Sequence, residues 1–361
     1  MARQSSICAA LFIAAVCTPK PVLCAEPPDW ITISDPGNRN CTREEAPGLW
    51  GTSVQTPDRG FGRVDYTFQI AKTEVTNIQW LEFVRAYAPY WTGVAFDSNF
   101  TGSGVNWSGT TKTYSVTPGT EDFPIAVSWR MAARYCNWLH NNKADEIESF
   151  HSGVYDVNSF GVDESTRITD QARRNPNSRY WIPDIDEWTK AMHWDPGFTG
   201  SGSGRYRYFP FSSDTADCPL NSSGQVPVGS LPECLSPWGV LDGSGGQQEW
   251  LETITWSLTA RWVRGSGVGA PLGFIHDRLD WYDSGFPDGI LKGLRLAKAV
   301  EQPCNAADAA DPLSVLDLGD IASFIESYLA GDVTADLALP AGEFDSLDIG
   351  MFVDLFVSGC D

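Results

Sequence analysis

The composition changes abruptly after Pro303, where two copies of one short unit follow each other at an offset of 28 residues. In each copy an acidic loop precedes a segment whose apolar residues recur at the i, i+3, i+4 and i+7 spacing of a helix. The equivalent apolar positions are Ile321, Phe324 and Ile325 in the first copy and Ile349, Phe352 and Val353 in the second. Two such helices can bury their stripes against each other. The sequence therefore predicts a small α-helical repeat pair over residues 300–361, separate from a larger domain over residues 25–299.

The charge is divided as unevenly as the composition. From Glu301 onward there are thirteen Asp and Glu residues and no Lys or Arg, so this tail carries −13 of the net charge of −21. Neither part of the chain has a basic stripe for phosphate groups, so nucleic acid is excluded as an expected partner. An acidic tail of this kind is suited to divalent cations or to solubility.

The first 24 residues are typical of a signal peptide. Arg3 precedes an apolar run from Ile7 to Val16, prolines interrupt that run, and Cys24 with Ala25 offers a cleavage site between small residues. The run is too short to span a bilayer, and no other segment is long and apolar enough to anchor the chain. We expect a protein that is secreted or attached to the cell surface.

Six of the nine cysteines remain after removal of that segment, and none of them forms a CxxC pair of the kind that binds zinc. An even number of cysteines in an oxidising compartment predicts disulfides. We expect Cys304 to pair with Cys360 across the tail, Cys218 to pair with Cys234 across one loop, and Cys41 to pair with Cys136 by elimination.

Capping residues and periodicity place the main elements of the larger domain. Helices are predicted to begin after Thr76, Ser128 and Asp184, the first and third with capping boxes completed by Gln79 and Glu187. A strand is predicted over 64–71, with Val64, Tyr66, Phe68 and Ile70 on one face. Residues 92–120 are expected to form a surface loop, and residues 195–270 to be loops crossed by short strands. The fifteen tryptophans predict a loop-rich core that aromatic side chains hold together.

A series of short segments occurs along residues 30–299 in a recognisable order. The segments are Trp30–Ile33, Ile70–Asn77, Phe123–Pro124 with Val127–Trp129, Trp181–Pro183 with Asp186–Trp188, Pro227–Gly229, Trp238–Asp242, Gly245–Trp250, Arg264–Ser266 and Gly293–Arg295. Together they resemble the formylglycine-generating enzyme family, also called the sulfatase-modifying factor domain. The resemblance implies an α+β, loop-rich, C-type-lectin-like fold.

Two activities known in that family are not expected here. Its oxidases bind copper through two cysteines shortly after the segment that corresponds to Arg264–Ser266, and soft sulfur ligands suit Cu(I). The stretch from Ser266 to Arg295 contains no cysteine, so we expect no copper. Other relatives form sulfoxides at an iron held by histidines of a separate helical domain, and this chain has only four histidines and no room for such a domain.

The resemblance also implies a structural calcium site at Gly245–Trp250. Glu249 would supply a carboxylate, and Gly245 and Gln247 would supply backbone carbonyls. The alternative is that Glu249 accepts hydrogen bonds from buried amides and binds no cation.

The acidic tail resembles dockerin modules, whose calcium loops are related to EF-hands. Each copy has Asp at loop positions 1, 10 and 13, namely Asp308, Asp317 and Asp320 in the first and Asp336, Asp345 and Asp348 in the second. An EF-hand loop also takes side-chain oxygens at positions 3 and 5, where this chain has Ala and Pro. Calcium binding is therefore expected to be weak, and a metal-free helical pair used for attachment is the alternative.

The segment that replaces the family's catalytic wall offers the remaining site candidates. His276, Asp277 and Arg278, with Arg264 and Arg295, are the residues expected to line any surviving cleft. The alternative is a surface loop, with Arg264 and Arg295 holding the fold through backbone carbonyls. No catalytic residue is therefore assigned.

These observations predict an exported, non-catalytic domain that acts as a binding or scaffold module and is attached through its tail to an unknown ligand, surface or assembly. Two alternatives remain open. The domain is an enzyme of the formylglycine-generating and sulfoxide-synthase superfamily with a diverged, copper-free cleft, or it binds nothing small and only the tail has an interaction role.

Overall fold

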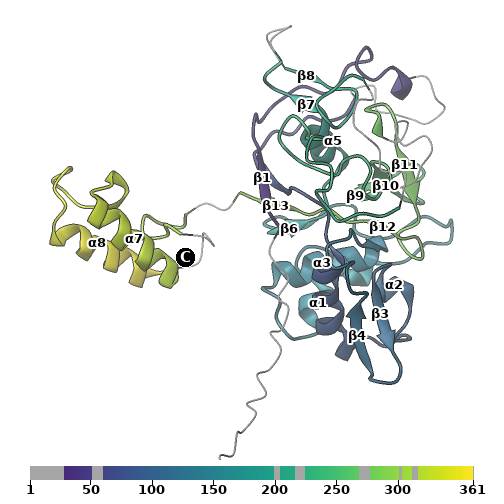
Figure 1. Ribbon diagram of the computed structural model, residues 1–361, viewed down its shortest axis with the longest axis horizontal. Coiled ribbons are helices and arrows are strands. Elements are labelled where there is room, and N and C mark those ends of the chain that lie inside the picture. Colours follow the sequence, from purple (N-terminus) through teal and green to yellow (C-terminus); the bar gives the residue numbers. More distant parts are fainter. Residues whose placement is uncertain are drawn as a thin grey trace, which may run out of the picture.

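The computed structural model describes residues 28–50, 60–198, 204–215, 224–267, 277–300, 303–310 and 316–360. Figure 1 shows the larger domain with α1 (Asn77–Tyr87), α2 (Ser98–Thr101) and α3 (Trp129–His140) at one end and α5 (Ile185–His193) toward the other. Short elements complete the helical part of this domain: α4 (Glu148–His151), η1 (Pro47–Trp50), η2 (Ala88–Tyr90) and η3 (Val157–Ser159). The predicted signal peptide, residues 1–24, lies outside the described residues.

Two sheets of short strands lie between the helical ends. The first has the order β1 (Trp30–Ile33), β2 (Phe68–Ala71), β13 (Ala297–Ala299), β6 (Tyr180–Trp181) and is antiparallel throughout. The second has the order β11 (Asp283–Gly285), β10 (Arg261–Arg264), β9 (Glu249–Ile254), β12 (Lys292–Gly293), β5 (Ala126–Val127), with β12 parallel to β9. Both sheets thus join segments that are far apart in the sequence, and this topology brings residues 249, 264 and 295 together.

The predicted helix starts are confirmed. Thr76 and Asp184 cap α1 and α5, and Gln79 and Glu187 complete the two capping boxes. Helix α3 begins after Ser128 and buries the predicted stripe that includes Trp129 and Cys136. The caps satisfy amide groups that a helix leaves without partners in its first turn, which explains why these starts are readable from local sequence.

Two predictions for the N-terminal half are corrected. Strand β2 covers only 68–71, and Tyr66 is 43% exposed because its hydroxyl turns to donate to Glu187 at 2.6 Å. Residues 92–120 are more than a loop, since they include α2 and an antiparallel hairpin of β3 (Val105–Ser108) and β4 (Thr113–Val116). A second hairpin joins β7 (Trp194–Asp195) to β8 (Arg205–Tyr206).

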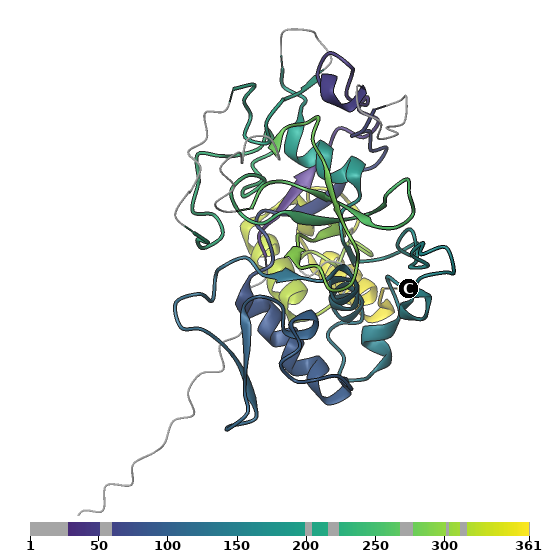
Figure 2. The ribbon, with the colours of Figure 1, turned by 90° about the vertical axis from the view of Figure 1, so that its right-hand side faces the viewer.

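Aromatic side chains fill the core of the larger domain, as the tryptophan content predicts. Trp80, Trp129, Trp188 and Trp250 are fully buried, and each indole N–H has an acceptor. Viewed from the side in Figure 2, the helices and sheets surround this interior. The acceptors of these indoles lie in α2, β5 and β9, so the four tryptophans tie these elements to the core.

The tail contains α7 (Leu318–Ala330) and α8 (Ser346–Ser358), with η4 (Val333–Ala335) between them. Figure 1 draws these helices to the left of the larger domain, and they have a hydrophobic cluster of their own. Phe324 stacks on Phe352 with ring centroids 4.1 Å apart. The predicted stripes are only partly buried, since Ile325 and Val353 are each 49% exposed.

The disulfide predictions have mixed outcomes. Cys304 and Cys360 are joined, with their Cα atoms 5.3 Å apart, and they close the tail. Cys234 is disulfide-bonded, whereas Cys218 lies outside the described residues. The pairing of Cys41 with Cys136 is wrong, because both are free buried thiols. The Cys41 sulfur accepts from the Phe61 amide, whereas Cys136 belongs to the buried face of α3, so each thiol has separate surroundings.

No helix within the described ranges has both the length and the apolar character needed to cross a membrane.

Candidate functional site

Asp277 lies in a buried pocket of polar side chains beside β10. Its side chain accepts a hydrogen bond from the Ser244 hydroxyl, and Ser266 also bonds to it. The residue is 1% exposed. Burial raises the pKa of the Asp277 carboxyl to about 7, and the two serines and the Arg264 charge reduce that effect. At neutral pH this carboxyl can therefore hold or release a proton.

Arg264 links this group to a buried histidine. Its guanidinium donates to the Leu279 and Trp281 carbonyls and lies 3.3 Å from the Nε2 atom of His193. His193 Nδ1 is 3.0 Å from the Arg207 carbonyl. A ring that donates from Nδ1 to this carbonyl has Nε2 free to accept from Arg264, which is the neutral form. Burial and the Arg264 charge both lower the pKa of His193, in agreement with that form.

The other predicted cleft residues do not converge on Asp277. Arg278 forms an ion pair with Asp280 at 2.8 Å, and its guanidinium lies over the Tyr208 ring. His276 lies outside the described residues. The expectation of a plain surface loop is also incomplete, because Asp277 and Asp280 turn inward while Trp281 is 40% exposed.

Arg295 and Glu249 form a second buried group, in which Glu249 is the first residue of β9 and Arg295 lies in the segment between β12 and β13. The guanidinium of Arg295 contacts both Glu249 oxygens, with the shortest distance 2.7 Å, and both side chains are fully buried. Arg295 also donates to the Ala71 and Leu241 carbonyls. The alternative assignment of Arg264 and Arg295 to backbone carbonyls is therefore confirmed.

Glu74 and Asp242 add two carboxyl groups near this ion pair. Glu74 Oε1 accepts from the Gln247 amide at 2.6 Å, while its Oε2 is buried without a hydrogen bond. Asp242 accepts from the Gly229 amide at 2.7 Å. Burial and the neighbouring Glu249 charge raise the pKa of Glu74 well above its usual value. Three carboxyl groups, those of Glu74, Asp242 and Glu249, thus lie near the single charge of Arg295.

A calcium ion at Gly245–Trp250 does not fit these contacts. The Glu249 oxygens already accept from Arg295 and from the Trp188 indole at 2.6 Å, so they have little capacity left for a cation. The Gly245 and Gln247 amides donate to Ser266 and Glu74. The positive charge of Arg295, paired with Glu249, also disfavours a second cation on this carboxylate.

The tail carboxylates are also engaged with the backbone. Asp317 and Asp345 cap α7 and α8, with Asp320 and Asp348 completing the capping boxes. Asp348 Oδ1 accepts from the Leu337 and Ala338 amides at 2.9 and 2.8 Å, and Asp320 Oδ1 accepts in the same way from Ala309 and Ala310. Asp320 and Asp348 are thus held by backbone amides of the preceding loops.

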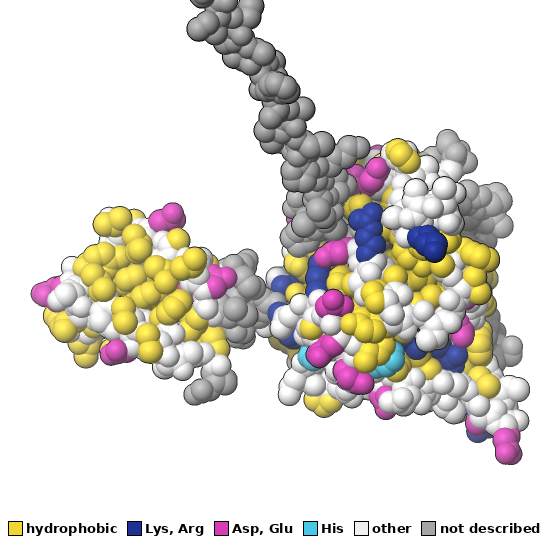
Figure 3. Space-filling view, turned by 90° about the horizontal axis from the view of Figure 1, so that it is seen from below, with side chains coloured by type: hydrophobic (Ala, Val, Ile, Leu, Met, Phe, Trp, Pro, Cys, Tyr) yellow, Lys and Arg dark blue, Asp and Glu magenta, His cyan; other side chains and the backbone are white. Residues whose placement is uncertain are grey.

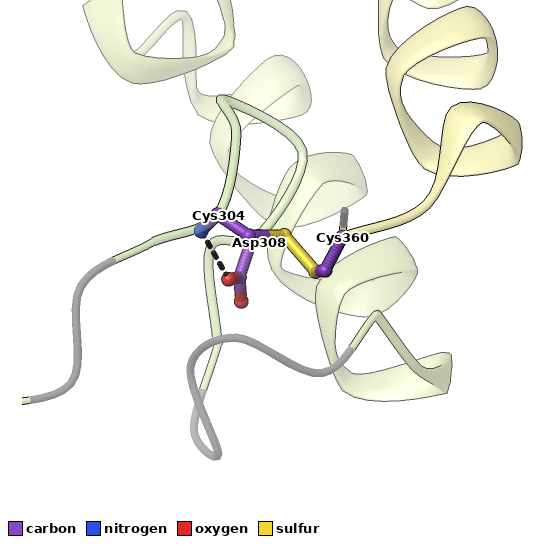
Figure 4. A group of neighbouring side chains, drawn as sticks. All are labelled: Cys304, Asp308 and Cys360. Carbon is purple, nitrogen blue, oxygen red and sulfur yellow. Dashed lines mark hydrogen bonds between the residues drawn. A yellow bond between two sulfur atoms is a disulfide. The ribbon is translucent and has the colours of Figure 1, made fainter. Parts of the chain in front are cut away.

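Asp308 and Asp336, the first residues of the two loops, each accept an amide hydrogen bond and do not cap α7 or α8. Asp308 accepts from the Cys304 amide at 2.7 Å, and Asp336 accepts from the Gly342 amide at 2.6 Å. The Oδ1 atom of Asp336 is buried without a hydrogen bond. In the described part of the chain, Asp308 belongs to the only group of three metal-type ligands within 4.8 Å, and its partners Cys304 and Cys360 are joined as a disulfide (Figure 4). Neither sulfur is a thiolate, so this group is not a metal centre.

The two free thiols do not form a copper pair. Burial raises the pKa of the Cys41 thiol to about 11 and that of Cys136 well above its usual value. Charged neighbours of Cys41 include Glu45 and Arg264, whereas Glu252 is the charged neighbour of Cys136. Two protonated thiols in different surroundings lack the reactivity of a thiolate pair.

Sequence reasoning missed several members of both buried groups. Ser244, His193, Glu74 and Asp242 come from three separate segments, and the fold brings them near Asp277 or Arg295. Glu74 and Asp242 do fall inside segments that carry the family resemblance. A signal was therefore present, although nothing local marked these acids as buried.

Comparisons with known proteins give one family match and two similar solved structures. Residues 25–299 match the family described as "Sulfatase-modifying factor enzyme 1-like domain". The chain is similar to the solved structure described as "Crystal Structure of CarF", with 20% identity, 76% of this chain and 99% of that chain covered, and a TM-score of 0.42. It is also similar to "Structure of PvdO from Pseudomonas aeruginosa", with 16% identity, coverage of 76% and 92%, and a TM-score of 0.38. No curated protein was found to match the sequence.

Proposed function

Because the chain belongs to the family of sulfatase-modifying factor enzyme 1-like domains, we propose that it is an exported, non-catalytic member that acts as a binding or scaffold module. The observation that carries the proposal is the state of its thiols. Ser266–Arg295 has no cysteine, and the free thiols Cys41 and Cys136 are buried and protonated at neutral pH. Copper-dependent oxidation, which the resemblance implies for other members, lacks its ligands here.

The buried charges support a structural role for the region around Arg264, Arg295 and Glu249. Arg264, Arg295 and Glu249 bond to backbone carbonyls or to each other and are closed to solvent. Removing one partner from such a buried ion pair leaves an uncompensated charge, so these residues hold the loops in place. The C-type-lectin-like description of the fold, which the resemblance implied, remains part of this proposal.

The tail is proposed as the attachment element. Ile321, Phe324, Ile325 and Tyr328 of α7 face Ile349, Phe352 and Val353 of α8 around an apolar groove of about 430 Å³. Figure 3 shows apolar side chains gathered on this part of the molecule. Acidic residues without any Lys or Arg surround the groove. The fitting partner is thus a protein surface with an apolar ridge and basic flanks.

Metal content and oxygen uptake of the purified mature chain test the non-catalytic proposal. The chain would be incubated with Cu(I) and a cysteine-containing peptide, and copper, O₂ consumption and peptide mass would be measured. We expect no copper-dependent O₂ uptake, and the same copper content in the parent and in a Cys41→Ser/Cys136→Ser variant. Copper-dependent uptake with a change in peptide mass would overturn the proposal.

One observation favours the alternative of a diverged, copper-free enzyme. Asp277 has a pKa of about 7 because of burial, and it bonds to Ser244, which is the kind of pair that acid–base chemistry uses. An enzyme that used this pair would lose turnover in Asp277→Asn without a loss of folding. Because Asp277 is 1% exposed, we favour the non-catalytic proposal.

A further inference from the structure

A pocket of about 660 Å³ lies at the end of the larger domain that carries α1 and the β3–β4 hairpin. This volume is within the range of roughly 300–1,000 Å³ that is typical of sites for small organic ligands. Its lining combines aromatic and basic side chains, namely Trp91, Trp107, Tyr114, Arg85 and Lys112, with no acidic residue. In Figure 1 this end is remote from α5 and β10, so the pocket is separate from the Asp277 group.

Packing against neighbouring aromatic rings holds the aromatic walls of the pocket in place. The Trp91 ring stacks on buried Phe100 at 4.9 Å, and its indole N–H donates to the Val94 carbonyl at 3.1 Å. Trp107 packs against Tyr114 at 4.6 Å, and Tyr114 meets Phe100 edge-on at 5.6 Å. Both indoles are half-buried, so each keeps a part of its surface open to a ligand. Such fixed aromatic surfaces lose little conformational freedom when a flat apolar group packs on them.

The loop that carries Trp91 is shaped around its ring. A Cβ atom at Gly93 would lie 2.5 Å from the Trp91 Cζ2 atom, so no side chain fits at position 93 without moving the indole. The close approach of the loop therefore fixes both the position of the ring and the width of the pocket.

The two cations of the pocket have no acidic partner in the described ranges. Arg85 donates one N–H to the Tyr114 carbonyl at 3.0 Å, which holds its guanidinium at the wall, and neither Arg85 nor Lys112 forms an ion pair there. The chain has 46 acidic and 25 basic residues, so a pocket with only basic side chains is a local exception. Figure 3 views this end and shows Lys and Arg side chains among apolar ones.

Lys112 has a left-handed backbone conformation that lysine rarely adopts. It is the last residue of the hairpin turn, its φ is +53°, and its amide donates to the Ser108 carbonyl at 2.7 Å. Glycine and asparagine adopt this left-handed conformation more readily than lysine does. The hairpin therefore carries a cation at the edge of the pocket where local conformation alone would select another residue.

We propose that this pocket binds an acidic saccharide, a short oligomer of uronate units whose ring C–H faces pack on Trp91 and Trp107 and whose carboxylates meet Arg85 and Lys112. A pyranose presents an apolar face and polar edges, which matches aromatic walls flanked by donors. An anionic ligand compensates the two unpaired cations. The inference rests on the proposed function, since it names the ligand class of the binding module.

Calorimetric titration of the mature full-length chain with trigalacturonate tests the proposal. The fully methyl-esterified trisaccharide is the matched neutral probe, and uridine monophosphate is the probe for a nucleotide site. We expect trigalacturonate to bind with a Kd of about 1 mM or tighter, more weakly as salt is added, and both other probes to bind at least about tenfold more weakly. Equal binding of the methyl ester, tighter binding of the nucleotide, or no binding of trigalacturonate would overturn the proposal.

Lys112→Asn is the variant of choice, because asparagine suits the left-handed turn and removes only the cation. It should weaken trigalacturonate binding about tenfold or more while the melting temperature stays equal or rises. Arg63→Gln, which removes an exposed arginine paired with Asp65, is the matched charge control and should leave binding unchanged. Unchanged binding in Lys112→Asn would place the ligand elsewhere. That failure is distinct from failure of the proposed function, which copper-dependent O₂ uptake would reveal.

Discussion

At the scale of single residues, Asp277 and Glu74 show how burial changes the chemistry of a carboxyl group. Both lie within polar groups that distant segments assemble. Sequence alone identified Asp277 as a candidate but could not identify its partner Ser244, because the contact spans 33 residues. The pKa of each acid follows from the absence of water and the identity of its neighbours, and neither is local information.

The Asp277 carboxyl makes the stability of the larger domain depend on pH. Its folded-state pKa is about 7, whereas an unfolded aspartate titrates near 4, so between these values only the folded chain holds the proton. The free energy of unfolding should fall by up to roughly 4 kcal/mol as pH rises from about 4 to 7, then stay level with respect to this group. Guanidinium unfolding at pH 4.5 and 7.5 would measure it.

Asp277→Asn is expected to lack that decline while keeping its bond to Ser244. Asp65→Asn, at an exposed carboxylate, is the control and should retain the decline of the free energy of unfolding with pH. A variant and parent with parallel pH profiles would contradict the assigned pKa.

Gly246 is a second residue-scale test. A Cβ atom at this position would lie 2.4 Å from Glu74 Oε2, and Glu74 is buried and held by the Gln247 amide. Gly246→Ala should lower the free energy of unfolding by about 1–3 kcal/mol through overpacking. The same change in a Glu74→Ala background should cost much less, and equal costs in the two backgrounds would show that Glu74 is not the obstacle.

At the scale of elements, local signals were reliable where a residue accepts hydrogen bonds from the free amides of the helix that directly follows it. The capping boxes at Thr76 and Asp184 were readable because cap and partner lie three residues apart. The β3–β4 hairpin was missed because its Gly, Ser and Thr residues are typical of loops. Its pairing instead depends on Trp107 opposite Tyr114, a cross-strand contact. The pocket of the further inference lies on this hairpin and was missed with it.

The tail loops should be sensitive to acid and insensitive to chelators. Amide hydrogen bonds lower the pKa of Asp320 and Asp348 in the folded chain. Their contribution is therefore complete above the ordinary pKa of about 4 and is lost as pH falls through the lower folded value. The protection factors of peptides 318–330 and 346–358, which correct for the slower intrinsic exchange in acid, should fall in that acidic range and should not respond to EDTA at pH 7.

Asp348→Ala should accelerate exchange of the Leu337 and Ala338 amides at neutral pH, since these amides lose their acceptor. Asp354→Ala, at an exposed position of α8, is the control on the same helix. Faster exchange after EDTA would instead indicate a cation in the loops.

The disulfide between Cys304 and Cys360 should contribute to the tail alone. It closes a loop with a sequence separation of 56, which corresponds to about 4 kcal/mol of restricted unfolded-chain freedom. In a Cys304→Ser/Cys360→Ser variant, exchange in α7 and α8 should accelerate strongly. Tryptophan fluorescence is the internal control, because all fifteen tryptophans precede residue 300 and their melt should not move. A shifted fluorescence melt would mean that the tail supports the larger domain.

At the scale of the whole molecule, the described residues of the tail form a hydrophobic cluster that shares no residue with the two clusters of the larger domain. The break in composition after Pro303 predicted this division, because a new pattern of charge and periodicity begins there. What the tail contacts was not predictable, since exposure of Ile325 and Val353 depends on how the two helices cross.

Deletion of residues 300–361 should therefore separate folding from attachment. The fluorescence melting temperature of the truncated chain should stay within about 1 °C of the parent, since a change of 1 kcal/mol would shift the melting temperature of a domain of this size by roughly 2 °C. In fractionated cells of the source, the full chain should be retained with the surface or assembly fraction and the truncated chain released. Equal distribution of both forms would remove the attachment role from the tail.

The apolar groove of the tail also affects self-association of the protein at high concentration. Its exposed Ile, Leu and Val side chains would favour sticking between copies, but every copy brings thirteen like charges to the encounter. That repulsion acts over a Debye length of about 8 Å at physiological ionic strength and shrinks to about 3 Å at 1 M salt. Concentrated salt thus screens the electrostatic repulsion between the tails but leaves the apolar groove exposed. This protein should therefore stay dispersed in dilute buffer and self-associate in concentrated salt.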